Sequence, residues 1–256
     1  MRRRLAVAAA LGGIALTALA TAAGAQGRRF LYGEPVQPNP DYDGQFTFAR
    51  IRYGPPTAVV NRSIPWSHDY PVGERNFMQM LDRVSLLGPK TVETSIVGLD
   101  DPALFRYPIA YMAEPGYWEM TDDEARRFRE YLEKGGFVIF DDFSEDRGGW
   151  DAFAEAFRRV MPGARFYDLD ASHPIFHAFF EIDSLELLPQ LYDVGSPILR
   201  AVFEGNDPSR RMIAMINFNT DISEYWEGDG YEFRPAWEYN EAYKFGINYV
   251  MYAMTH

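Results

Sequence analysis

Two adjacent aspartates follow a short apolar run, and two histidines stand further along the chain. Asp141 and Asp142 come directly after Phe137–Phe140, while His173 and His177 belong to the segment His-Pro-Ile-Phe-His. Neighbouring carboxylates repel each other, so one can keep a proton near neutral pH or both can share a cation. We therefore take Asp141, Asp142 and His173 as candidate catalytic residues for acid–base hydrolysis. In the alternative interpretation, one aspartate caps the next turn, the other is solvated, and His173 is structural.

Polar and aromatic residues also follow other predicted strands, and they form a candidate ligand-binding set. Its members are Trp66, Asp69, Tyr70, His177, Asp221, Trp226 and Glu227. Tryptophan and tyrosine rings combine a flat apolar face with a polar group, which suits stacking on a sugar ring. The alternative for Trp66 and Trp226 is packing over the edge of the sheet.

No metal ligands and no cofactor can be assigned from the sequence. Asp141, Asp142, His173 and Asp221 offer oxygen and nitrogen ligands that suit a divalent ion, but they follow no metal-binding spacing. The chain has no Gly-rich phosphate loop and no Gly-x-Ser-x-Gly nucleophile elbow. It also has no cysteine, which excludes a thiol nucleophile and a thiolate metal site.

Alternating strands and helices are predicted to position these residues. Apolar patterns indicate strands at 46–53, 91–97, 105–112, 137–140, 164–169 and 211–217, and helices at 74–87, 150–161 and 240–254, with a further helix after Thr121. This alternation predicts an α/β fold with a doubly wound, mostly parallel sheet and right-handed crossovers. Ligands bind such sheets outside the carboxyl ends of the strands, where the candidate residues fall.

The clearest local signal spans residues 121–142. Thr121-Asp-Asp-Glu124 reads as a capping box at the start of a helix, and Gly135-Gly136 supplies the left-handed stop. Phe137–Phe140 is short and wholly apolar, as expected of a parallel strand that is buried on both faces.

Residues 1–25 have the three parts of a secretory signal peptide. Arg2–Arg4 form a positive region, an apolar stretch follows, and Ala23-Gly24-Ala25 supplies the small residues of a cleavage site. We read residues 26–45 as an extended N-terminal arm and 46–256 as a single α/β domain. The apolar stretch is shorter than the ~20 residues that cross a bilayer, so we expect cleavage and an extracytoplasmic protein, periplasmic or secreted, with no membrane span.

The charge balance bears on the class of partner. The net charge is −12, and it becomes −15 once the three arginines of the signal peptide are removed. Such an acidic surface repels nucleic acid and anionic lipid. The expected partner is therefore an unknown small molecule or an envelope protein, and not a nucleic acid.

Several segments resemble one bacterial family in their order along the chain. They are Phe46-Thr-Phe-Ala-Arg-Ile-Arg-Tyr, Tyr107-Pro-Ile-Ala-Tyr, the run 131–142, His173-Pro-Ile-Phe-His and Gly246-Ile-Asn-Tyr-Val-Met-Tyr-Ala. The chain resembles domain of unknown function 4159 over residues 46–256. That resemblance implies a flavodoxin-like sheet related to class I glutamine amidotransferase-like proteins, including the trehalose-utilisation group. In those relatives the strand at 137–140 leads into a nucleophile elbow, but here it leads into Asp141-Asp142, so glutaminase activity is not carried over.

The sequence favours a binding function over catalysis. We expect a ligand or partner, such as a carbohydrate or an envelope component, to bind at the carboxyl edge of the sheet. One alternative is a hydrolase that uses Asp141 and Asp142 with His173, with or without the assistance of a metal ion. The other is a structural subunit of an envelope complex.

Overall fold

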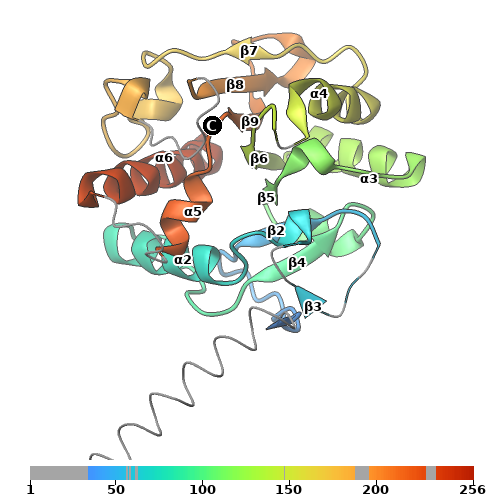
Figure 1. Ribbon diagram of the computed structural model, residues 1–256, viewed down its shortest axis with the longest axis horizontal. Helices are drawn as coiled ribbons and strands as arrows, with labels where there is room; N and C mark the ends of the chain where they lie inside the picture. Colours follow the sequence, from blue (N-terminus) through green and yellow to red (C-terminus); the bar gives the residue numbers. More distant parts are fainter. Residues whose placement is uncertain are drawn as a thin grey trace, which may run out of the picture.

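The computed structural model describes residues 34–55, 57, 59–60, 63–146, 148–187, 196–228 and 235–256. The predicted signal peptide and the first part of the arm lie outside these residues. A seven-stranded sheet with the order β4-β2-β5-β6-β9-β8-β7 forms the centre (Figure 1). Its strands are β2 Ala49–Arg52, β4 Ser95–Gly98, β5 Ile109–Ala113, β6 Phe137–Phe143, β7 Tyr167–Asp168, β8 Ile198–Phe203 and β9 Met212–Phe218.

The first five strands of that order are parallel to one another. β4 and β5 flank β2, and β6 lies between β5 and β9 in the same direction. β8 is antiparallel to both β9 and β7. The prediction of an α/β fold with a mostly parallel sheet is therefore confirmed, and β8 is a strand that the sequence patterns did not predict.

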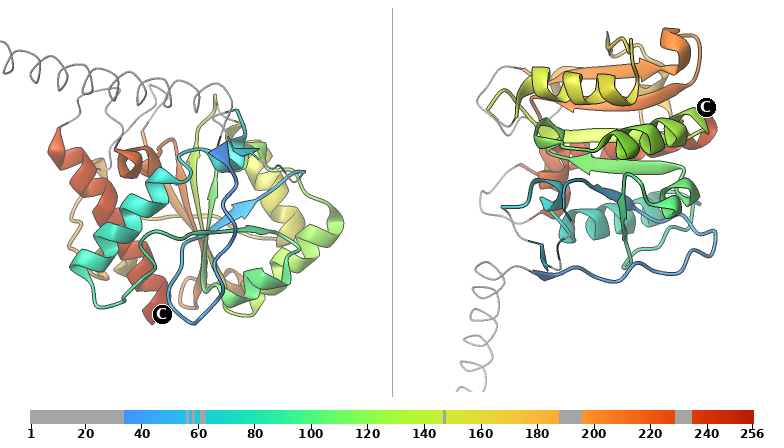
Figure 2. Two further views of the ribbon diagram at one scale, coloured as in Figure 1. Left: turned by 90° about the horizontal axis from the view of Figure 1, so that it is seen from below. Right: turned by 90° about the vertical axis from the view of Figure 1, so that its right-hand side faces the viewer.

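Helices cover both faces of the sheet (Figure 2). Helices α2 Val72–Val84, α5 Ile222–Glu227 and α6 Ala236–Thr255 lie on one face, and α3 Asp122–Glu133 and α4 Gly149–Val160 lie on the other. Each face buries its own apolar cluster, in which the side chains of alternate strand residues meet those of the helices. None of the described helices is both long and apolar enough to cross a membrane.

The local signals at 121–142 are confirmed. The Thr121 hydroxyl accepts a hydrogen bond from the Glu124 backbone N–H, and the Glu124 carboxylate accepts one from the Thr121 N–H. All seven residues of β6 are buried. β6 therefore lies inside the sheet, and its last residues carry the aspartate pair to the carboxyl edge.

Four predicted strands begin three or four residues later than expected, at Ala49, Ser95, Ile109 and Tyr167, and the third of these bears on the site. Asp101 caps a 3₁₀ turn at Pro102–Arg106, so the strand predicted at 105–112 starts only at Ile109. Pro108 immediately before Ile109 cannot donate a backbone hydrogen bond, and it therefore fits the beginning of a strand. β5 therefore covers Ile109–Ala113 and ends next to the site.

The described part of the N-terminal arm lies along the outer strand of the sheet. β1 Glu34–Pro35 pairs with β3 Val59–Val60 in a small separate sheet. Further along, the Asn39 side-chain amide donates to the Ile96 carbonyl oxygen at 2.8 Å and accepts from the Ile96 N–H at 2.8 Å. Asn39 therefore satisfies both backbone groups that β4 presents at Ile96 on its open side.

Candidate functional site

The carboxyl ends of neighbouring parallel strands bring a set of acidic side chains and one imidazole together. Along the chain, β2 is followed by β4, which lies on one side of it, and then by β5, which lies on the other side. The strand order therefore reverses between β2 and β5, and this reversal is the switch point of the sheet. His68 and Asp69 follow β2, Glu114 follows β5, and Asp142 lies near the end of β6. The segment after β9 adds Asp221 and Glu224 at the start of α5, so that four strand ends supply the site.

His68 is the only imidazole among the described residues that lies in this cluster. Its Nδ1 atom is 2.8 Å from Asp142 Oδ2 and 3.3 Å from Asp69 Oδ1, and its side chain is 12% exposed. Burial acts to lower the pKa of His68, but its contacts with Asp142 and Asp69 outweigh burial and raise that pKa to about 12. The two carboxylates therefore favour the imidazolium form of His68.

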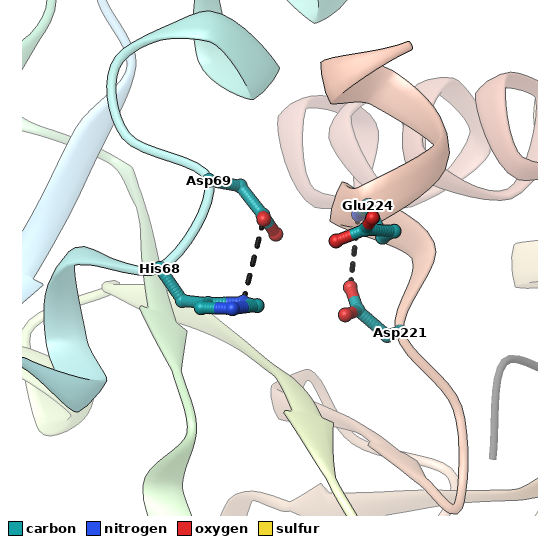
Figure 3. Close-up of side chains that lie close together, drawn as sticks. All are labelled: His68, Asp69, Asp221 and Glu224. Carbon is teal, nitrogen blue, oxygen red and sulfur yellow. Dashed lines mark hydrogen bonds and ion pairs between the residues drawn. The ribbon is translucent and has the colours of Figure 1, made fainter. Parts of the chain in front are cut away.

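Within the described part of the chain, two groups of side chains have the spacing to hold a metal ion, and both contain His68. The first is His68, Asp69, Asp221 and Glu224, which Figure 3 shows with the loop carrying His68 and Asp69 facing the start of α5. The second is His68, Glu114 and Asp142. In each group one ligand atom from every residue lies within 4.8 Å of all the others. Imidazole nitrogen and carboxylate oxygen together suit a divalent transition ion or zinc.

Three of these residues have left-handed backbone conformations. The φ angle is 61° at Asp69, 43° at Glu114 and 61° at Asp142. Such conformations cost about 1–3 kcal/mol each outside glycine, and they persist where surrounding contacts impose them. Here the Tyr53 hydroxyl donates to the Glu114 carbonyl oxygen at 2.8 Å, and the Gly73 N–H donates to the Asp69 carbonyl oxygen at 2.9 Å. Residues whose side chains meet at the site therefore have unfavourable backbone conformations, which the rest of the fold stabilises.

Asp141 is fully buried beside the cluster, and hydrogen bonds surround it. Its oxygens accept from the Tyr111 hydroxyl and the Asn217 amide, both at 2.9 Å, and from the N–H groups of Ile222 and Ser223 at 3.1 and 3.2 Å. Burial raises the pKa of Asp141 to about 7, with the charge of Asp142 adding to the effect and the hydrogen bonds opposing it. Asp141 therefore holds the first turn of α5 against the sheet.

Asp221 and Asp69 respond to burial in opposite ways. Burial raises the pKa of Asp221 well above its ordinary range, and the charges of Asp142, Asp69 and Asp141 add to this. Burial also acts to raise the pKa of Asp69, but His68 and the Ser223 hydroxyl, which donates to Asp69 Oδ2 at 2.5 Å, overcome it and lower the pKa. The site therefore contains acids that resist losing their protons beside one that is readily ionised.

The structure corrects the expectation that His173 approaches the aspartate pair. The His173 ring packs against the rings of Phe203 and Tyr252. Phe203 pairs with Met212, the first residue of β9, so His173 lies at the amino edge of the parallel strands. The cause is the 3₁₀ turn at Pro174–His177, which buries Ile175 and Phe176 near the end of α6. The hydrolase hypothesis that joins Asp141 or Asp142 to His173 therefore has no geometric basis.

The predicted ligand-binding residues divide into three groups. Asp69 and Asp221 lie in the site, whereas Trp66 and Trp226 are buried in the apolar clusters and present no ring face for stacking on a sugar. The Trp226 indole donates to the Ala242 carbonyl oxygen at 3.1 Å. Packing is therefore the correct interpretation for both tryptophans.

The other three predicted residues make contacts outside the cluster. The Tyr70 hydroxyl accepts from the Gln37 N–H at 3.4 Å, and Asn76 donates to the Glu227 carbonyl oxygen at 3.1 Å. His177 lies 2.6 Å from Glu181 and 2.7 Å from the Ala171 carbonyl oxygen.

Sequence reasoning missed His68, Glu114 and Glu224 as site residues. His68 is adjacent to Asp69 in a loop after a predicted strand, and this adjacency was the available signal. Glu114 follows the last residue of β5 directly, but the misplaced start of that strand obscured its position. Glu224 belongs to α5, whose six residues are too few to give a helical pattern.

Comparison with known proteins gives one match. The model of the family described as domain of unknown function (DUF4159) matches residues 47–254. No curated protein matches the chain.

Proposed function

The chain belongs to the DUF4159 family, and we propose that it is a binding protein whose ligand at the carboxyl edge of the sheet is a divalent metal ion. The observation that carries the proposal is the position of His68 Nδ1, at 2.8 Å from Asp142 and 3.3 Å from Asp69. A metal ion bound at Nδ1 would take the place of the proton of His68 and bind the same imidazole and carboxylates. This refines the binding function that the sequence favours by naming the class of ligand.

The balance of buried charge supports a cation. Near the site, the described residues include six buried carboxylates, those of Asp69, Glu74, Glu114, Asp141, Asp142 and Asp221, and two buried basic groups, those of Arg50 and His68. Arg50 pairs with Glu74, and burial favours the protonated forms of Asp141 and Asp221, which leaves His68 facing the carboxylates of Asp69, Asp142 and Glu114. Buried charges are costly unless they are paired or coordinate a metal. A divalent ion would supply the missing positive charge without opening the site.

The donor set favours some ions over others. One imidazole nitrogen with several carboxylate oxygens suits Zn²⁺ or Mn²⁺. Ca²⁺ takes six to eight oxygen ligands and is expected to bind less tightly. The side chains of Asp69 and Asp142 are 1% and 0% exposed, so a small ion fits the site better than a sugar does.

Metal analysis after equilibrium dialysis tests the proposal. Chelator-treated full chain should take up one Zn²⁺ or Mn²⁺ per molecule, with Zn²⁺ bound more tightly. His68→Gln should abolish this uptake. Asp123→Asn is the matched control, because Asp123 is a 63% exposed carboxylate on α3 that pairs with Arg126 outside the site. Absence of stoichiometric uptake by the wild type, or equal uptake by His68→Gln, would overturn the proposal.

The finer fold class and the location of the protein are part of the same proposal. In chain order, the parallel strands occupy the sheet as second, first, third, fourth and last, and this order supports a flavodoxin-like class. Asp142, with φ of 61° near the end of β6, stands where the glutamine amidotransferase-like relatives would carry their nucleophile. The signal peptide predicted at 1–25 supports an extracytoplasmic location, where the ion would be taken up.

A further inference from the structure

A buried arginine lies beneath the loop that presents His68 and Asp69. Arg50 is on β2 and is 1% exposed. Its Nη1 atom donates to the carbonyl oxygens of Trp66 at 3.1 Å and His68 at 2.8 Å, the two residues on either side of Ser67. The guanidinium therefore holds the backbone of the loop at the very residue that supplies the imidazole.

The same guanidinium is tied to the other side of the site. Arg50 is in register with Tyr111 of β5, and its guanidinium carbon lies 5.1 Å from the centre of the Tyr111 ring. The Tyr111 hydroxyl donates to Asp141, which in turn accepts the N–H groups of Ile222 and Ser223 on α5. A continuous set of contacts therefore joins the His68 loop to the start of α5, which carries Asp221 and Glu224.

The chemistry of this position requires an arginine. The guanidinium is planar and directs several donors at fixed angles, and here Nε donates to Glu74 while Nη1 donates to the two loop carbonyl oxygens. A lysine ammonium could pair with Glu74, but it lacks the fork that reaches the carbonyl groups as well.

Stability alone does not account for the pair. Replacing both members of a buried ion pair by apolar residues of similar volume is often neutral or stabilising. The remaining donors of Arg50 hold the loop that carries a candidate metal ligand. The pair is therefore better explained by the position that it imposes on this loop. Glu74 would then serve to keep the arginine charge neutralised inside the fold.

We propose that Arg50, with Glu74 as its counter-ion, is a positioning residue that fixes the loop at 65–69 so that His68 and Asp69 meet the carboxylates of β6 and α5. The metal-binding part of this inference rests on the proposed function. The position of the imidazole does not, because it can be measured in the metal-free protein.

The central test is the double variant Arg50→Met/Glu74→Leu, which removes both buried charges together. We expect it to remain folded, with an unfolding midpoint in urea somewhat below that of the wild type because the carbonyl oxygens of Trp66 and His68 lose their donor. Its Zn²⁺ affinity should fall by about tenfold or more, as for lost supporting contacts in metal sites. The ¹⁵N resonances of the His68 ring in metal-free protein at one fixed pH should also move. Arg50→Lys should show a partial loss of affinity, because it keeps the charge and loses the fork.

A second ion pair provides the matched control. Arg200 on β8 pairs with Asp168 on β7 at 2.6 Å, away from the site. Arg200→Met/Asp168→Asn should leave the Zn²⁺ affinity and the His68 resonances unchanged. If Arg50→Met/Glu74→Leu keeps both wild-type values, the positioning role is wrong. If the double variant does not fold, Arg50→Lys decides by the same two measurements. If the wild type binds no Zn²⁺, the proposed function fails, and the His68 resonances alone decide whether Arg50 positions the ring.

Discussion

The carboxylates of Asp141 and Asp142 serve different parts of the molecule although the residues are adjacent. Asp141 accepts the N–H groups of Ile222 and Ser223 at the start of α5, while Asp142 lies 2.8 Å from His68. Successive side chains of a strand point to opposite faces, and the left-handed conformation at Asp142 turns the chain further. The pair therefore supplies one structural carboxylate and one site carboxylate, and the two should respond differently to substitution.

Asp141→Asn should destabilise the protein by about 1–3 kcal/mol, because the new amide nitrogen brings two donors and accepts no hydrogen bond, whereas both oxygens of the Asp141 carboxyl can accept even when one of them carries a proton. Asp142→Asn should cost less, since His68 keeps its contact with Asp69 and a like charge beside Asp141 and Asp221 disappears. Urea unfolding of the metal-free proteins measures both free energies of unfolding. A larger loss for Asp142→Asn than for Asp141→Asn would contradict this assignment of roles.

Metal-free protein should lose stability as the pH rises from about 4 to 7. The pKa of Asp141 is about 7 in the folded state against an ordinary 3.8, so the folded state holds a proton that the unfolded chain has released in this range. The contribution is fully present below pH 3.8 and is lost as the pH rises through 7. The raised pKa of Asp221 acts in the same direction.

The measurement is a series of urea unfolding curves across that pH range, with Asp141→Asn as the control. The variant should show a flatter dependence on pH, because the titrating group is gone. An equally steep decline in the variant would show that Asp141 is not the cause.

Substitution of individual ligands should identify which group of side chains binds the ion. His68→Gln removes a ligand common to both groups, whereas Glu224→Gln affects only the first and Glu114→Gln only the second. At a free Zn²⁺ concentration of about 100 times the Kd, the wild type should gain about 2.7 kcal/mol of stability over the chelator-treated protein. Thermal unfolding with and without Zn²⁺ should show this gain lost in His68→Gln and in one of the two glutamate variants. Retention of the full gain in both glutamate variants would argue against both groups.

The mature protein should begin at or near Gln26 and lie outside the cytoplasm. The prediction follows from the order of the arginines, the apolar stretch and Ala23-Gly24-Ala25. N-terminal mass spectrometry of protein from its native source measures the first residue. Intact Met1 in that protein would contradict cleavage.

Local chemistry made part of the fold predictable from the sequence. The capping box at Thr121 and the wholly apolar run at Phe137–Phe140 are signals within a few residues, and both predicted the observed structure. β8 was not predicted although five of its six residues are apolar; Arg200 interrupts the apolar run, and its side chain stacks on Trp150 at 3.9 Å. α5 is held by long-range hydrogen bonds to Asp141 and not by its own pattern.

The site was predictable only where chain order and spatial order agree. Asp142 ends a buried parallel strand, so its arrival at the carboxyl edge follows from topology. His173 also follows a strand, but the chain then runs back along α6, where Asn248 exchanges two hydrogen bonds with the backbone of Phe180. The residues around His173 do not predict this change of direction, because it depends on contacts with α6, which lies far along the chain at Ala236–Thr255.

The contact between Asn39 and Ile96 affects how copies of the chain behave toward one another. An uncovered outer strand is a template on which a strand of a second molecule can add, and this is a common route to aggregation. At Ile96 one amide side chain already occupies the donor and the acceptor that such a strand would need. Asn39 belongs to the arm and precedes the domain predicted from residue 46, so shortening the protein to that domain would remove its protection against edge-to-edge self-assembly.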